Sequence, residues 1–167
     1  METDVYDLHD YEQDLDNFAK RYDAWGQGEA DTPELYPDRQ HCDRVMPFFI
    51  SEYGGIKWDP SHQEDSGAWG YGQQANSQEE FVTRYRGLTN TLLNNPKMFG
   101  FCYTQLYDVE QECNGIYDYH RHPKVDIAAI RAIHTGCAAI EDEDRDTVAQ
   151  PMAASAESDA HTTREAA

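Results

Sequence analysis

Two kinds of apolar pattern alternate along the chain. Short apolar runs of strand character occupy residues 3–9, 47–51 and 98–106. The second, Pro47-Phe48-Phe49-Ile50-Ser51, is continuous, and such runs are typical of parallel strands that are buried on both faces. We therefore predict a strand at each of these three places.

Between the strand segments, apolar residues recur at helical spacing. The first predicted helix, residues 14–25, carries an apolar stripe at positions i, i+3, i+4 and i+7, formed by Leu15, Phe18, Ala19 and Tyr22. The second begins at Ser77, where Ser-Gln-Glu-Glu predicts a capping box with Glu80. The third covers residues 123–134.

Long polar loops separate these elements. Residues 26–46 are rich in Pro, Gly and Asp, and residues 54–76 hold Trp58, Trp69 and Tyr71 among many glycines. Loops of this length in a compact domain are functional or disordered, and the aromatic residues favour function. The order of strands and helices predicts a parallel α/β arrangement.

Composition divides the chain in two. Hydrophobic residues make up 39% of it, yet the mean hydropathy is −0.85. We predict a folded domain over residues 1–140 and a disordered, acidic, Ala/Ser-rich tail over residues 141–167, which has almost no large apolar residue. The net charge of −19 repels nucleic acid and anionic membranes, so neither is an expected partner.

The cysteines and the N-terminus indicate the compartment. No CxxC pair is present among Cys42, Cys102, Cys113 and Cys137, which predicts free thiols in a reducing environment. The acidic N-terminus lacks the apolar core of a signal peptide, and no run approaches the roughly 20 apolar residues of a membrane span. A cytoplasmic location is expected.

Glu52 follows the second apolar run directly. It therefore lies at the C-terminal end of a strand, where α/β sheets and barrels carry their active sites. His9, Asp10 and Tyr11 end the first strand, and residues 103–105 end the third, so all reach the same edge. The alternatives are a strand-end acid that caps a turn or pairs with an arginine, and tyrosines that belong to the core or rim.

A metal site is not expected. His120 and His122 lie near Asp118, but such clusters are typical of solvated loops. We also expect no cofactor.

Four stretches together resemble a known family. SEYGG after an apolar strand, WGYG in the next loop, GFCYTQLYDVEQECNGIYDYHRHPK, and the opening TDVYDLHDYEQD resemble the end of the catalytic barrel of family 2 glycoside hydrolases, the group of β-galactosidases, β-glucuronidases and β-mannosidases. The resemblance covers roughly residues 3–135. It implies a partial (β/α)8 TIM barrel, about the last three β/α units, and a β-glycoside as substrate.

The resemblance also implies roles for single residues. Glu52 matches the catalytic nucleophile. Tyr11 matches the tyrosine that hydrogen-bonds the nucleophile, with His9 as a competing match. Tyr103 matches an aromatic platform for the sugar ring, and Trp69 would line the aglycone side.

One part of the family pattern is missing. The acid/base glutamate of the family follows an asparagine, and the chain contains no Asn-Glu dipeptide. A full barrel takes about 250 residues, so we expect a fragment that lacks the N-terminal portion of the enzyme and is inactive alone. A non-catalytic carbohydrate-binding remnant and a non-functional truncation product are the alternatives.

The substrate sugar is less closely defined. The glucuronidases of the family carry Asn-x-Lys where this chain has Glu112, Cys113 and Asn114. An acid at that place disfavours a glucuronide by charge. We expect a β-galactoside, with mannoside and glucoside open.

Overall fold

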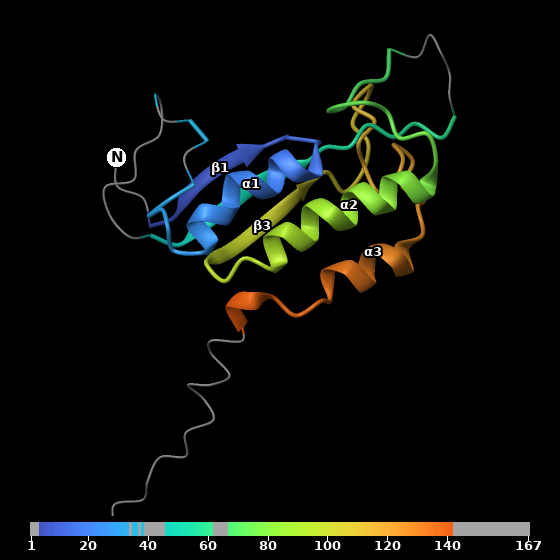
Figure 1. Ribbon diagram of the computed structural model, residues 1–167. Coiled ribbons are helices and arrows are strands. Elements are labelled where there is room, and N and C mark those ends of the chain that lie inside the picture. The colour runs from blue at the N-terminus through green and yellow to red at the C-terminus, as the bar shows by residue number, and fades with distance from the viewer. Residues whose placement is uncertain (1–3, 34, 37, 39–45, 62–66, 142–167) are drawn as a thin grey trace, which may run out of the picture.

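The computed structural model describes residues 4–33, 35, 36, 38, 46–61 and 67–141 (Figure 1). Strands and helices alternate as β1 (Tyr6–Asp10), α1 (Leu15–Gly26), β2 (Phe48–Gly54), α2 (Gln78–Leu93), β3 (Met98–Thr104) and α3 (Ile127–His134). The strands form one sheet in the order β1-β2-β3, and both pairings are parallel. The predicted parallel α/β arrangement is confirmed.

Several predicted bounds shift. β1 begins at Tyr6, and β2 continues to Gly54, so Glu52 lies inside the strand and not at its last residue. The last helix begins at Ile127 because the Asp126 carboxylate accepts a hydrogen bond from the backbone of Ala128 at 2.9 Å, which fixes the helix start there and not at residue 123.

The start of α2 follows the prediction with one change. The Ser77 hydroxyl accepts from the backbone N–H of Glu80 at 3.2 Å, as an N-cap does. The Glu80 carboxylate, however, accepts from the backbone N–H of Asn76 at 3.0 Å and from its side chain at 2.8 Å. The reciprocal half of the capping box therefore reaches one residue further back than the motif predicts.

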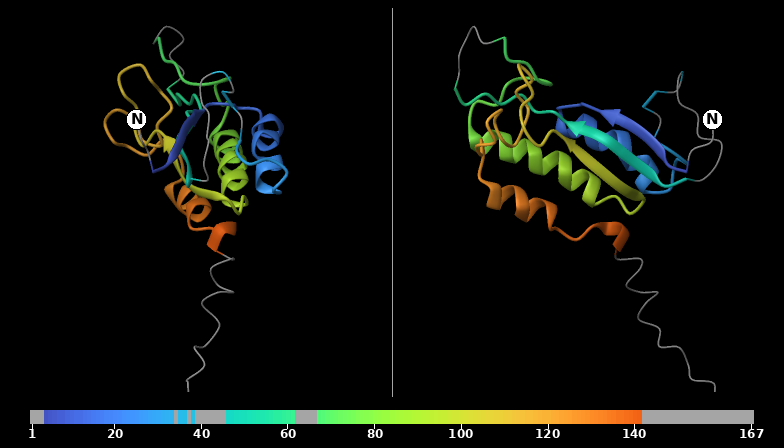
Figure 2. Two further views of the ribbon diagram at one scale, coloured as in Figure 1. Left: turned by 90° about the vertical axis from the view of Figure 1, so that its left-hand side faces the viewer. Right: turned by 180° about the vertical axis from the view of Figure 1, so that it is seen from behind.

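The helices cover one face of the sheet (Figure 2). Along β1, burial alternates strictly, with Asp7 and His9 exposed on the uncovered side. Along β2, Phe49 is only partly buried, so the prediction of a run buried on both faces is wrong for this chain. No helix of the described residues covers the second face.

The covered face is an aromatic core. It contains Tyr6, Phe48, Phe18, Tyr22, Trp25, Tyr53, Phe81 and Tyr85. The rings of Trp25 and Phe48 lie 4.8 Å apart, which joins α1 to β2. Buried phenols are paired, since Tyr53 and Thr89 share a hydrogen bond of 2.8 Å.

Asp10 ties the end of β1 to α1. Its carboxylate is 1% exposed and accepts a hydrogen bond from the Tyr22 hydroxyl at 2.7 Å. It also pairs with the guanidinium of Arg21 and accepts from the backbone of Glu12 at 3.0 Å. The chain direction at residue 11 is therefore set by a buried polar network.

The cysteines, the predicted tail and the loop over residues 26–46 lie partly outside the described residues. Among the described residues, no disulfide forms at Cys102, Cys113 or Cys137, while Cys42 lies outside them. The predicted tail, apart from its first residue, and much of the loop over residues 26–46 also lie outside them.

Within the described ranges, no helix has the length and apolar character needed to cross a membrane.

Candidate functional site

The Glu52 side chain contacts residues at the end of β1. His9 is its register partner in the neighbouring strand, next to a register shift between Leu8 and His9. The Tyr11 hydroxyl donates a hydrogen bond to Oε2 of Glu52, and Nδ1 of His9 lies 3.2 Å from the same oxygen. The structure therefore brings together three residues predicted from the sequence, and both competing matches, Tyr11 and His9, contact the carboxylate.

His9 and Glu52 are both partly exposed to solvent. The side chains of His9 and Glu52 are 50% and 40% exposed. Burial, followed by the hydrogen bond to Glu52, raises the pKa of the Tyr11 phenol well above its usual value. The phenol therefore stays protonated at neutral pH and remains a donor to the carboxylate.

Tyr71 stacks on Tyr11. The two ring centroids are 3.6 Å apart and the planes differ by 6°. The backbone of Tyr71 is held to the turn after β2, since its N–H donates to the carbonyl of Gly55 at 2.8 Å. Tyr71 was not among the predicted site residues. The signal that could have found it is the glycine-rich WGYG loop, which lets an aromatic ring approach the backbone.

Trp69 lies beside this stack. Its ring makes an edge contact with Tyr71 at 6.2 Å, and 47% of its surface is exposed. Its backbone N–H donates to Gln111 at 2.8 Å, and its carbonyl accepts from Cys113 at 2.8 Å. These two backbone hydrogen bonds join the loops that follow β2 and β3, which lie together in Figure 1.

Tyr103 has a different environment. Its hydroxyl donates to the carbonyl of Asn114 at 3.2 Å and accepts from the backbone N–H of Ile56 at 3.3 Å. Its ring lies 4.6 Å from Tyr85, and a Cβ at Gly54 would overlap it. Burial raises the pKa of its phenol. The structure thus gives Tyr103 packing contacts, and its role as a sugar platform stays a prediction.

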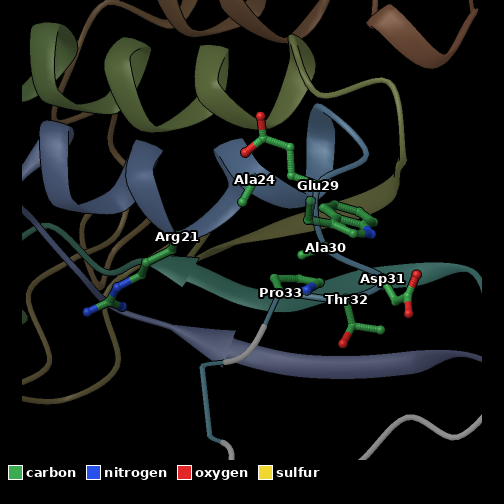
Figure 3. A pocket seen from close by; sticks show the side chains of 8 residues that line it. Arg21, Ala24, Glu29, Ala30, Asp31, Thr32 and Pro33 are labelled. Atoms are coloured by element: carbon green, nitrogen blue, oxygen red, sulfur yellow. The ribbon is translucent and has the colours of Figure 1, made fainter.

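Some cavities lie away from Glu52. One of about 420 Å³ is lined by the C-terminal half of α1 and by residues 29–33 (Figure 3). Glu52 and its contacts do not line it. In the part of the chain that the structure describes, no group of three or more His, Cys, Asp or Glu could hold a metal ion.

A buried ion pair holds the loop after β3. The Lys124 ammonium lies 2.8 and 2.9 Å from the two carboxylate oxygens of Asp108, and Asp108 also accepts from the backbone of Gly115 at 2.8 Å. Burial raises the pKa of the Asp108 carboxyl against the opposing effect of Lys124. Sequence reasoning missed this pair, because its members are 16 residues apart in a loop without periodicity.

No protein-family model matches the chain, and no curated protein matches it. Solved structures do. A β-glucuronidase of Faecalibacterium prausnitzii matches 81% of this chain with a TM-score of 0.52 and 17% identity, and an exo-β-agarase matches 78% with a TM-score of 0.50 and 20% identity. The chain spans only 22% and 16% of those two proteins. The described residues have a fold that matches part of a glycosidase domain.

Proposed function

We propose that this chain is the C-terminal portion of the catalytic barrel of a retaining β-glycosidase related to family 2, with Glu52 as the nucleophile. The observation that carries the proposal is the contact of the Tyr11 phenol and the His9 ring with one carboxylate oxygen at the ends of parallel strands. The similarity to parts of glycosidase structures supports the barrel, and the motifs around Glu52 support the family.

The chemistry needs an ionised Glu52. Its carboxylate attacks the anomeric carbon and forms a glycosyl ester, while a second carboxyl group protonates the leaving oxygen and later activates water. The phenol donor of Tyr11 fixes the orientation of the carboxylate. Because the Glu52 side chain is 40% exposed, a sugar can reach it.

The second carboxyl group must come from another segment. The chain has no Asn-Glu dipeptide, and β1 and β3 are both edges of the sheet. A closed (β/α)8 barrel uses about 250 residues. We therefore propose that the missing N-terminal portion pairs with these edges and supplies the acid/base group, and that the chain alone does not turn over.

We propose a β-galactoside as the substrate. An acid, Glu112, occupies the place where a glucuronidase of the family carries the first residue of its Asn-x-Lys motif. The Glu112 carboxylate accepts a hydrogen bond from the side-chain amide of Asn114 at 3.1 Å. A glucuronide brings a second carboxylate, and like charges at this place disfavour it. An aryl β-galactoside should be cleaved faster than an aryl β-glucuronide by the completed protein.

A substitution at Glu52 tests the reaction. The chain is produced together with the segment encoded upstream of it, and hydrolysis of aryl β-glycosides is measured. Glu52→Gln should lower kcat by about 10³- to 10⁶-fold, and Glu52→Gly should regain turnover with azide, which replaces the missing nucleophile. Glu110→Gln, which removes an exposed acid, is the matched control. Equal activity of Glu52→Gln and the unchanged protein would refute the proposal.

Sugar binding without catalysis is the second candidate function. The exposed ring of Trp69 favours it, because an open indole face suits stacking on a sugar. Calorimetry of the chain alone with galactose and lactose should then give a binding signal that Trp69→Ala removes. No heat of binding with a folded sample would exclude this second function.

A further inference from the structure

The Tyr11 hydroxyl can serve Glu52 only if its ring is held in place. A tyrosine side chain rotates about two bonds, and a half-exposed ring at a strand end has few core contacts to stop it. On one side, Tyr11 contacts His9 only by an edge, with centroids 6.4 Å apart. On the other side, the ring of Tyr71 covers it at 3.6 Å.

Ring attraction alone does not explain this stack. Aromatic pairs prefer offset or edge-to-face arrangements, with centroids about 4.5–7 Å apart, over a close parallel sandwich. The Tyr11–Tyr71 pair, with centroids at 3.6 Å and planes 6° apart, is such a sandwich. The surrounding backbone must therefore impose it.

Gly55 makes room for both rings. A Cβ at this position would overlap the ring of Tyr71 and lie 3.1 Å from Cδ1 of Tyr11. The φ of Gly55 is also +63°, in the left-handed region that favours glycine. Any other residue here would push the two rings off the turn.

Backbone hydrogen bonds fix the Tyr71 side of the stack. Besides the bond to Gly55, the carbonyl of Tyr71 accepts from the N–H of Lys57 at 3.4 Å, and Ala75 donates to the carbonyl of Lys57 at 3.0 Å. On the Tyr11 side, the side-chain amide of Gln13 donates to the carbonyls of Tyr11 and Gly54. Each tyrosine is thus anchored to the turn after β2 through its backbone.

We propose that Tyr71 is a positioning residue, which holds the Tyr11 phenol against the Glu52 carboxylate through a stack imposed by Gly55. Its importance for turnover rests on the proposed function of Glu52, but the positioning itself does not. The ring of Tyr71 covers that of Tyr11, and burial is the largest cause of the raised pKa of Tyr11. Loss of the Tyr71 ring should therefore free the phenol and lower that pKa.

The test follows the ionisation of Tyr11 in the full chain. Tyrosine is labelled with ¹³C at Cζ, the Tyr11 signal is assigned from a Tyr11→Phe sample, and the spectrum is recorded from pH 8 to 11. In the unchanged protein the Tyr11 signal should stay protonated where an ordinary tyrosine, with a pKa of about 10, is half ionised. In Tyr71→Leu the ionised fraction of Tyr11 at pH 10.5 should rise at least about threefold.

Two controls separate positioning from general damage. Tyr71→Phe keeps the ring and should restore the Tyr11 titration, whereas Tyr119→Leu, at an exposed tyrosine, should leave it unchanged. The buried Tyr53 signal reports whether each variant keeps its core. A Tyr71→Leu variant with an intact Tyr53 signal and an unchanged Tyr11 titration would overturn the proposal.

A measurement on the unchanged chain covers the case in which Tyr71→Leu unfolds. A stacked Tyr11 ring should flip slowly and show separate signals for its two sides. Rapid averaging, together with ordinary titration, would also overturn the proposal. In the completed enzyme Tyr71→Leu should lower kcat and change KM little. If no enzyme activity is found while the Tyr11 titration behaves as expected, the proposed function fails and the positioning role stands.

Discussion

Asp10 and Tyr11 are neighbours in the chain, and each joins a phenol to a carboxylate in a different environment. Asp10 faces the helices, is 1% exposed, and accepts from Tyr22 at 2.7 Å. Tyr11 donates to Glu52, whose side chain is 40% exposed. The chemistry is the same, but burial makes the first contact a part of the core and leaves the second carboxylate accessible to a ligand.

Removing the two carboxylates should give the largest contrast. Asp10→Ala leaves the buried Tyr22 hydroxyl without its acceptor and removes one of the two carboxylate partners of Arg21, which keeps Glu12, so it should cost about 2–4 kcal/mol of unfolding free energy. Glu52→Ala removes a half-exposed group and should change stability by less than about 1 kcal/mol. Urea unfolding measures both. Equal losses would show that the two environments do not differ as described.

Removing the two hydroxyls should give a smaller contrast. Tyr22→Phe leaves the buried Asp10 carboxylate short of a donor, at a cost of about 1–3 kcal/mol. In Tyr11→Phe, water can donate a hydrogen bond to Glu52 in place of the lost hydroxyl. The expected loss of unfolding free energy is therefore below about 1 kcal/mol. Thermal unfolding of both variants and of the unchanged protein measures the two losses of stability. A larger loss in Tyr11→Phe than in Tyr22→Phe would contradict the comparison.

Alkaline pH should act on the same two phenols alike, with a still smaller effect on stability. Burial, followed by the charge of Asp10, raises the pKa of Tyr22 in the folded state. The folded chain therefore holds this proton where the unfolded chain, with a pKa of about 10, has lost it, so stability falls as pH rises above about 10.

Burial and Glu52 act on Tyr11 in the same direction. Since both phenols stay protonated in the folded chain up to pH 11, Tyr22→Phe and Tyr11→Phe should each flatten the alkaline loss of stability by a similar amount. Unfolding curves at pH 9, 10 and 11 provide the measurement. A variant whose stability falls with pH as steeply as that of the unchanged protein would contradict this prediction.

The convergence of Glu52, His9 and Tyr11 could be predicted from the sequence because the ends of parallel strands share an edge. Their detailed positions could not. Register shifts next to His9 and between Ile50 and Tyr53 decide which side chains face each other, and no local pattern encodes these shifts.

Contacts made by loops could not be predicted from the sequence either. Tyr71 reaches Tyr11 from a glycine-rich loop, and its place depends on a backbone bond to Gly55, far from it in sequence. The ring of Tyr103 packs on Gly54 and Tyr85, contacts that the sequence did not predict, and its role at the substrate stays a prediction. Such pairings depend on tertiary packing and have no periodic signal.

The central claim is that Glu52 is the nucleophile of a retaining glycosidase. The most direct test treats the chain, completed by its upstream segment, with a 2,4-dinitrophenyl 2-deoxy-2-fluoro-β-galactoside. Its good leaving group needs little acid assistance, and the fluorine slows hydrolysis of the glycosyl ester. Mass spectrometry of the digested protein should find the fluorosugar on Glu52. Attachment to another residue, or no attachment while the complex hydrolyses aryl β-galactosides, would contradict the account.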